Sequence, residues 1–210
     1  MSRWRPRAGR VLSLPAGLLL AACFFLPAVR GCDEAPIIPY REVLHLEGSA
    51  ILVGVYVVPY LWGLLAVVAM GSGLVRAARP KAPLVYCLVA ASLSLPCLGF
   101  ILFSALTGKG KERVVSAVLA APAAWLWAKL LSSAASKKDA AAQMARITWC
   151  ASLMDALWFC YWLATENPLY GLWLSAVSAV ALAAGGMLSE ENASEARRGS
   201  GDGLPRSFNA

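Results

Sequence analysis

The chain has 210 residues, of which 59% belong to the apolar set AVILMFWYC and only 15% are charged, and its formal net charge is +7. A typical soluble domain is about 45–50% apolar and about 25% charged, so this composition excludes an ordinary soluble protein and indicates an integral membrane protein. The polar segments between the apolar stretches are too short to fold as a separate catalytic domain.

Charge-poor stretches recur along the chain, and about 20 helical residues cross the roughly 30 Å hydrocarbon core of a bilayer. Six stretches satisfy this length and predict transmembrane helices over residues 11–29, 50–72, 83–107, 114–135, 147–165 and 169–189. The apolar runs are continuous and do not alternate with a period of two, which favours helices over a membrane β-barrel. The sequence therefore predicts an all-α protein in which residues 1–189 form one six-helix transmembrane bundle.

Lysine and arginine are distributed unequally between the two sides of such a six-helix path. One side carries Arg3, Arg5, Arg7, Arg10, Arg76, Arg79, Lys81, Lys129, Lys137, Lys138, Arg146, Arg197, Arg198 and Arg206. The other side carries Arg30, Arg41, Lys109, Lys111 and Arg113. Because cytoplasmic loops hold the excess of basic residues, both termini are predicted to lie in the cytoplasm. The same asymmetry accounts for the net positive charge, so no nucleic-acid partner is expected.

The longest segment between predicted helices covers residues 31–48, where Pro36 and Pro39 precede a mixed apolar and charged stretch. The prolines exclude a regular helix through its first half, and the second half has the pattern of a short interfacial amphipathic helix. We interpret this segment as a connector over the mouth of the bundle, with a partner-binding loop as the alternative. Residues 190–210 mix charged residues with Gly, Ser and Pro, which predicts a disordered cytoplasmic tail.

The amino terminus has two interpretations. A basic stretch, an apolar run and the sequence Leu20-Ala21-Ala22-Cys23 are typical of a bacterial lipoprotein signal, whose cleavage would leave a lipidated Cys23 as the first residue. However, the apolar run continues to Val29, which gives a full spanning length that a cleaved signal does not need. We therefore expect an uncleaved first helix.

Six cysteines lie at positions 23, 32, 87, 97, 150 and 160, and no two of them form a C-x-x-C pair. Cys87 and Cys97, like Cys150 and Cys160, are ten residues apart, or about 15 Å along a helix, so neither pair can form a disulfide or share a metal ion. Pairs between the two helices stay geometrically open, although cysteine also packs well as a small apolar residue. Cys32 lies clearly outside the predicted helices and is a candidate site, either as an idle thiol or in an intermolecular disulfide.

Catalytic constellations are missing from the sequence. The single histidine, His45, cannot supply an H-E-x-x-H metal site, and Asp155 has no second aspartate that would complete an aspartyl membrane protease. A phosphate-binding G-x-x-x-x-G-K-[ST] loop is absent as well. We therefore expect no enzyme, no cofactor and no metal centre.

Small residues recur every four positions in two predicted helices. They are Ser116, Ala120, Ala124 and Ala128 in one helix and Gly171, Ser175, Ala179 and Ala183 in the other. Such faces let membrane helices approach closely, so we expect them to pack within the bundle, with a homo-oligomer or another membrane-protein partner as the alternative. The lipid bilayer is the partner that the composition requires.

Two charged residues fall inside or beside predicted helices and are the candidate polar sites. Asp155 lies eight residues after the predicted helix start at residue 147, or about 12 Å into the membrane, so it is expected to face the bundle. Lys129 approaches from the cytoplasmic end of the preceding helix. Three interpretations are open: a Lys129–Asp155 ion pair, a neutral hydrogen-bonded acid, and a proton or cation site. The structural interpretations are favoured, because the sequence suggests no second polar residue near Asp155 to form a relay.

These patterns predict a multi-pass protein of the bacterial cytoplasmic (inner) membrane, because enrichment in Ala, Leu, Gly and Arg indicates a bacterium with a GC-rich genome. The expected role is that of a non-enzymatic accessory or structural component. The alternative is a small permease or channel subunit with Asp155 in a polar cavity.

Overall fold

The computed structural model describes residues 5–30, 35–41, 50–71, 82–134 and 140–201. Within these ranges the chain is almost entirely helical. The helices are α1 (Arg5–Cys23), α3 (Ala50–Gly71), α4 (Ala82–Thr107), α5 (Gly110–Ala134), α6 (Ala140–Thr165) and α7 (Tyr170–Gly201). The prediction of an all-helical chain is confirmed.

Four of these helices are long and apolar enough to cross a membrane. Their span-length portions are Ala82–Thr107, Gly110–Ser133, Ala140–Thr165 and Tyr170–Glu195. In α1 and α3 the described apolar portions are shorter, Val11–Cys23 and Val57–Ala69. The structure therefore gives a multi-pass membrane protein with at least four helices of spanning length.

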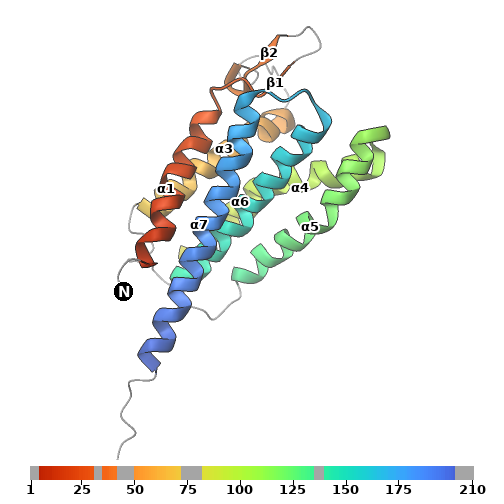
Figure 1. Ribbon diagram of the computed structural model, residues 1–210. Coiled ribbons are helices and arrows are strands. Elements are labelled where there is room, and N and C mark those ends of the chain that lie inside the picture. The colour runs from red at the N-terminus through yellow and green to blue at the C-terminus, as the bar shows by residue number, and fades with distance from the viewer. Residues whose placement is uncertain (1–4, 31–34, 42–49, 72–81, 135–139, 202–210) are drawn as a thin grey trace, which may run out of the picture.

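Successive helices run up and down through one bundle (Figure 1). The segments 24–30, 35–41, 108–109 and 166–169 lie at one end of the bundle, called here the loop end. The opposite end, called here the tail end, holds the first turn of α1 and the C-terminal part of α7. Among the described elements, α6 packs against α7, α5, α4 and α3, which places α6 at the centre of the bundle.

The first helix ends six residues earlier than the predicted span 11–29. After Cys23 the chain turns, and Val29–Arg30 (β1) pairs antiparallel with Pro36–Ile37 (β2), while Val29 also bridges to Pro168. Phe24, Phe25 and Leu26 form a turn that bonds back to Ala21, Ala22 and Cys23. Leu26 precedes Pro27 and is disfavoured in helical conformation, so the helix does not continue to Val29 although these residues are apolar. The backbone groups of Ala28 are satisfied by Ile37 and Leu169 instead of by a helix.

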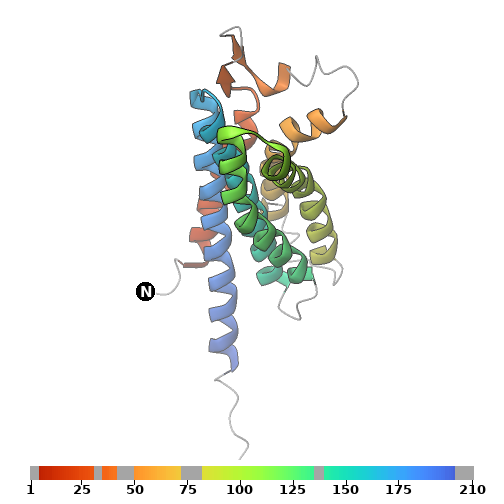
Figure 2. The ribbon, with the colours of Figure 1, turned by 90° about the vertical axis from the view of Figure 1, so that its right-hand side faces the viewer.

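The last helix is longer than predicted and differs from the expected disordered tail. Figure 2 shows α7 continuing well past the other helices at the tail end, and the helix extends to Gly201. Residues 190–201 are therefore helical, and the remaining residues of the expected tail lie outside the described ranges. Glu190 explains part of this extension because its carboxylate binds side chains of α6.

Glycines permit the closest helix contacts. A Cβ built on Gly185 of α7 would overlap the Ser13 hydroxyl of α1 and lie 2.9 Å from the Gly9 carbonyl oxygen. A Cβ on Gly63 of α3 would lie 2.8 Å from the carbonyl oxygen of Gly17. The absence of a side chain at these glycines lets α1 pack tightly between α3 and α7, and no larger residue fits at either crossing. The spacing of Gly9, Ser13 and Gly17 is the same four-residue pattern noted elsewhere in the sequence.

The two predicted small-residue faces differ in the structure. On α7 the face from Gly171 to Ala183 is buried in the bundle, as internal packing requires. On α5, Ser116 is buried whereas Ala124 and Ala128 are exposed. The internal interpretation therefore holds for α7, while part of the α5 face is directed away from the bundle.

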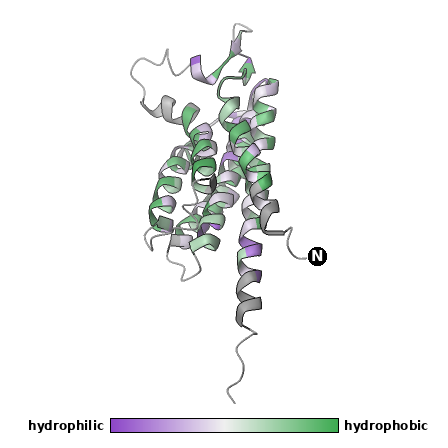
Figure 3. Ribbon diagram, turned by 90° about the vertical axis from the view of Figure 1, so that its left-hand side faces the viewer, coloured by the Kyte–Doolittle hydropathy of each residue, from purple (hydrophilic) through white to green (hydrophobic). Residues whose placement is uncertain are grey.

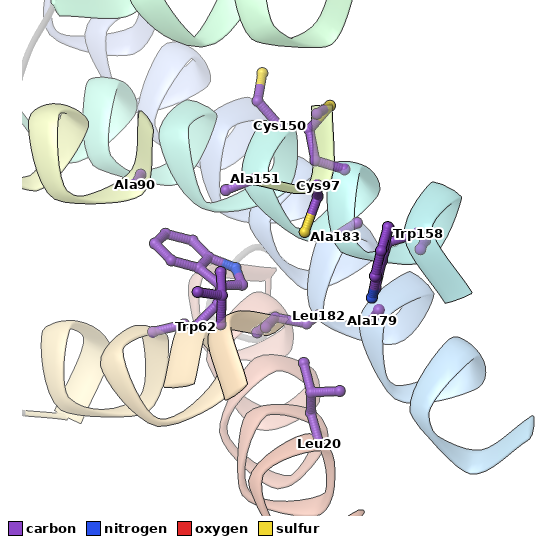
Figure 4. Packing of buried hydrophobic residues seen from close by; sticks show 14 of the residues in the cluster. Leu20, Trp62, Ala90, Cys97, Cys150, Ala151, Trp158, Ala179, Leu182 and Ala183 are labelled. Atoms are coloured by element: carbon purple, nitrogen blue, oxygen red, sulfur yellow. The ribbon is translucent and has the colours of Figure 1, made fainter. Parts of the chain in front are cut away.

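Apolar side chains fill the interior and also cover much of the outer surface. In the core the indole of Trp62 projects from α3 toward α6, beside small residues such as Ala90 and Ala151 (Figure 4). Large apolar side chains also remain exposed along the outer faces of the helices, and the hydrophobic colouring there gives way to polar residues on the C-terminal part of α7 (Figure 3). This surface fits a lipid environment.

Candidate functional site

The central helix α6 carries three polar residues on one face. Thr148, Ser152 and Asp155 are spaced by four and three residues, which places their side chains one above another on a helix. All three are buried, and only 2% of the surface of Asp155 is exposed. We call these three residues the polar stripe of α6.

Neighbouring helices satisfy the first two members of the polar stripe. The Trp62 indole donates a hydrogen bond to the Ser152 hydroxyl at 3.0 Å, and Ser152 in turn donates to the carbonyl of Thr148. Thr148 donates its own proton to the carbonyl of Met144 at 2.8 Å, so the Tyr86 hydroxyl is the donor in the 3.1 Å contact between Tyr86 and Thr148. These bonds tie α3 and α4 to α6.

Asp155 is different, because its Oδ2 atom is buried without a hydrogen-bond partner among the described residues. The thiol of Cys97 on α4 lies within electrostatic range of this carboxyl group. A buried polar group without a partner costs about 1–3 kcal/mol, and a charged one more. Asp155 therefore faces the bundle, as predicted, and its Oδ2 atom has no hydrogen bond among the described residues that would offset this cost.

Lys129 does not form the ion pair that one interpretation required. Within the described ranges no ion pair joins it to Asp155. Its Nζ atom instead lies 4.6 Å from the ring centroid of Trp125 and 4.6 Å from that of Trp149. A cation between two indole rings is stabilised by the ring quadrupoles, so the aromatic contacts take the place of the carboxylate.

The indole rings connect Lys129 to an ion pair that the sequence did not reveal. Trp149 donates from Nε1 to Oε2 of Glu190 at 2.8 Å, and Arg146 donates from Nε to Oε1 of the same carboxylate at 2.9 Å. We call Trp125, Lys129, Arg146, Trp149 and Glu190 the tail-end cluster. It joins α5, α6 and α7, and its Arg146–Glu190 ion pair was not predicted because both residues fall just outside the predicted spans.

The cysteines have the character of packing residues. Cys23, Cys87, Cys97 and Cys150 are buried, Cys160 is exposed, and all five are free thiols. Within the described ranges no three His, Cys, Asp or Glu side chains gather as a metal site would require. The remaining candidate, Cys32, lies outside the described residues.

No protein-family model matches this chain, and neither a curated protein nor a solved structure shows significant similarity to it. The class of the protein therefore comes from its own structure: it is a helical multi-pass membrane protein. Two polar features stand out in its interior, the polar stripe with Asp155 and the tail-end cluster.

Proposed function

We propose that the chain is a six-span protein of the bacterial cytoplasmic membrane, with both termini in the cytoplasm. The up-and-down order of α1 and α3–α7 supports six crossings, and the basic excess in the sequence falls on the side of a six-helix path that holds both termini. Reporter fusions at Ser200 and Glu42 test this, because the two positions are expected on opposite sides of the membrane. Two reporters on the same side would contradict the span count.

We further propose a non-enzymatic role as an accessory or structural membrane component. The observation that supports it is the use of interior polar groups to join helices: Trp62 binds Ser152, Tyr86 binds Thr148, and Ser104 contacts the Tyr161 hydroxyl at 3.3 Å. Groups that hold helices together in this way are typical of a rigid scaffold. Part of the small-residue face on α5 is exposed and offers a surface for a second copy or another membrane protein.

A second candidate function follows from Asp155. Ionisable residues inside membrane proteins frequently mark proton or ion pathways, and Asp155 is buried with an unpartnered oxygen beside two hydroxyl residues of the polar stripe. In this proposal the chain is a small permease or channel subunit, and the Asp155 carboxyl group binds a proton or a monovalent cation.

Flux measurements on the purified chain in proteoliposomes separate the two proposals. A scaffold is expected to give no flux of protons, Na⁺ or K⁺ above that of empty vesicles. A permease is expected to give flux that Asp155→Asn abolishes and that Glu112→Gln, which changes an exposed carboxylate on α5, leaves intact. Flux that survives Asp155→Asn would contradict the ion-site proposal. Robust flux of protons, Na⁺ or K⁺ through the wild-type chain would contradict the scaffold proposal, whether or not Asp155→Asn abolishes it.

A further inference from the structure

A groove opens between α1 and α3 toward the loop end of the bundle. The two helices touch at Gly17 and Gly63, where a Cβ on Gly17 would lie 2.9 Å from the Gly63 carbonyl oxygen. Beyond this crossing the helices leave a hollow of about 350 Å³. Its lining residues are Ala21, Ala22, Phe24, Phe25, Val57, Tyr60, Leu61 and Leu64.

The lining is apolar and open to the side on which a lipid would lie. Leu61 and Phe25 stand at the open side with 46% and 61% of their surfaces exposed, whereas Tyr60 is buried at the back of the hollow. Its ring packs against Phe24 at 5.5 Å and against Phe159 of α6 at 5.7 Å, which holds the rear wall in place. Ligand pockets measure about 300–1,000 Å³, so the hollow has room for part of an acyl chain.

A cationic group is fixed at the loop-end rim of this groove. Phe25 packs against Tyr40 with ring centroids 5.4 Å apart, and the Arg41 guanidinium lies 5.9 Å from the Tyr40 ring. The backbone N–H of Tyr40 donates to the Phe24 carbonyl at 3.2 Å, which anchors Tyr40 to the end of α1. Arg41 donates from Nε to the Tyr40 hydroxyl at 3.2 Å, which positions the guanidinium, and an arginine side chain is charged at physiological pH.

We propose that this groove binds one anionic phospholipid, with an acyl chain against Leu61 and Leu64 and the headgroup phosphate on Arg41. The chemistry fits both parts of such a molecule. An apolar hollow accepts the chain, and an exposed guanidinium donates charge-assisted hydrogen bonds to phosphate oxygens. The Tyr40 hydroxyl beside it is a further donor at the level where aromatic side chains meet lipid headgroups.

Native mass spectrometry of the purified full chain in detergent tests the proposal with two probes, phosphatidylglycerol and phosphatidylcholine of identical acyl chains. The wild-type chain is expected to retain one phosphatidylglycerol, bound about tenfold more tightly than phosphatidylcholine, as one charge-assisted contact provides. Arg41→Gln should remove this preference, because it weakens phosphatidylglycerol binding more than binding of phosphatidylcholine, whose choline cation already offsets the phosphate charge. The control Arg113→Gln changes an exposed arginine on α5 and should behave as wild type.

A second pair of variants tests the groove itself. Leu61→Trp fills the hollow and should abolish retention of both lipids, whereas Leu102→Trp, at a 40% exposed position of α4 outside the groove, should not. Equal binding of the two lipids by the wild type, an equal effect of the two arginine variants, or lipid retention by Leu61→Trp would each overturn the proposal. If the wild-type chain is a dimer that retains no lipid, and Leu61→Trp dissociates this dimer, the groove binds a second copy of the chain instead of a lipid. These outcomes do not depend on membrane orientation, so they stand apart from the reporter test of topology.

Discussion

The position of Lys129 between two indole rings predicts that its charge stabilises the fold through Trp125 and Trp149. Lys129→Met keeps an unbranched apolar stem and removes the ammonium group that lies 4.6 Å from the ring centroids of both Trp125 and Trp149. A cation–π contact is worth about 0.5–1 kcal/mol at exposed sites and about 2 kcal/mol when desolvated. Because Trp125 is 57% exposed and Trp149 is buried, we expect Lys129→Met to lower the free energy of unfolding by about 1–2 kcal/mol.

Double-mutant cycles measured by reversible unfolding in mixed micelles identify the partner of Lys129. The cycle of Lys129→Met with Trp125→Leu should give a coupling energy of about 0.5–1 kcal/mol, since Trp125 contributes one of the two ring contacts. The cycle of Lys129→Met with Asp155→Asn should be additive within about 0.5 kcal/mol, because no ion pair joins these residues. A coupling above about 1 kcal/mol between Lys129 and Asp155, with none to Trp125, would refute the assignment.

Three further predictions follow from helix packing, the tail-end cluster and the first helix. Gly185→Ala should destabilise the protein by about 1–3 kcal/mol because its Cβ would overlap α1, whereas Gly99→Ala, with nothing within 4 Å of the new atom, should be neutral or stabilising by up to about 1 kcal/mol; thermal unfolding compares them. Arg146→Gln should lower the free energy of unfolding by about 0.2–1 kcal/mol, because it removes the half-buried ion pair with Glu190. Denaturation should show a smaller loss in high salt, and a loss that does not depend on salt would contradict a contribution from this ion pair. The membrane-purified chain should show an intact mass of 22.2 kDa, because a lipidated Cys23 would need its buried side chain exposed; a lighter, lipid-modified chain would contradict this.

The lengths of the charge-poor stretches predicted the positions of α3 and α4 well, because the thickness of the bilayer sets the length of a transmembrane helix. The ranges 83–107 and 50–72 differ from α4 and α3 by one residue at an end. Some helices extend beyond the predicted spans and include charged residues. The start at residue 147 placed Arg146 in solvent, yet α6 begins at Ala140 and Arg146 binds Glu190 across the helices. A rule that treats every charge as solvated cannot predict such a boundary.

The end of the first helix illustrates a second limit of hydropathy. Phe24 to Val29 are apolar, so the charge-free length continues to Arg30, but the backbone there pairs with Ile37 and Pro168. These partners come from distant parts of the chain and leave no periodic signal in the sequence. Pro27 was the local signal, and prolines elsewhere in the chain are accommodated within helices, as Pro15 is in α1.

The importance of Asp155 was predictable, but its surroundings were not. An acid deep in a predicted span has to face the bundle, and it does. Its expected cation lies elsewhere because a lysine stem reaches several positions, and the two rings that hold Lys129 come from different helices. No pattern within one helix reports that arrangement.

The polar stripe gives Asp155 polar neighbours that were not expected from the sequence. The case against a relay rested on an acid without polar neighbours in its helix, yet Thr148 and Ser152 share its face at helical spacing. Each hydroxyl donates one hydrogen bond to the α6 backbone and accepts one from α3 or α4, so both stabilise the bundle and leave Asp155 as the member with an unpartnered oxygen. An apolar side chain of similar volume at this position would avoid the desolvation cost. Asp155 is therefore a buried ionisable group that packing alone does not explain, and this is why flux through the Asp155→Asn variant is the measurement that separates a scaffold from a permease.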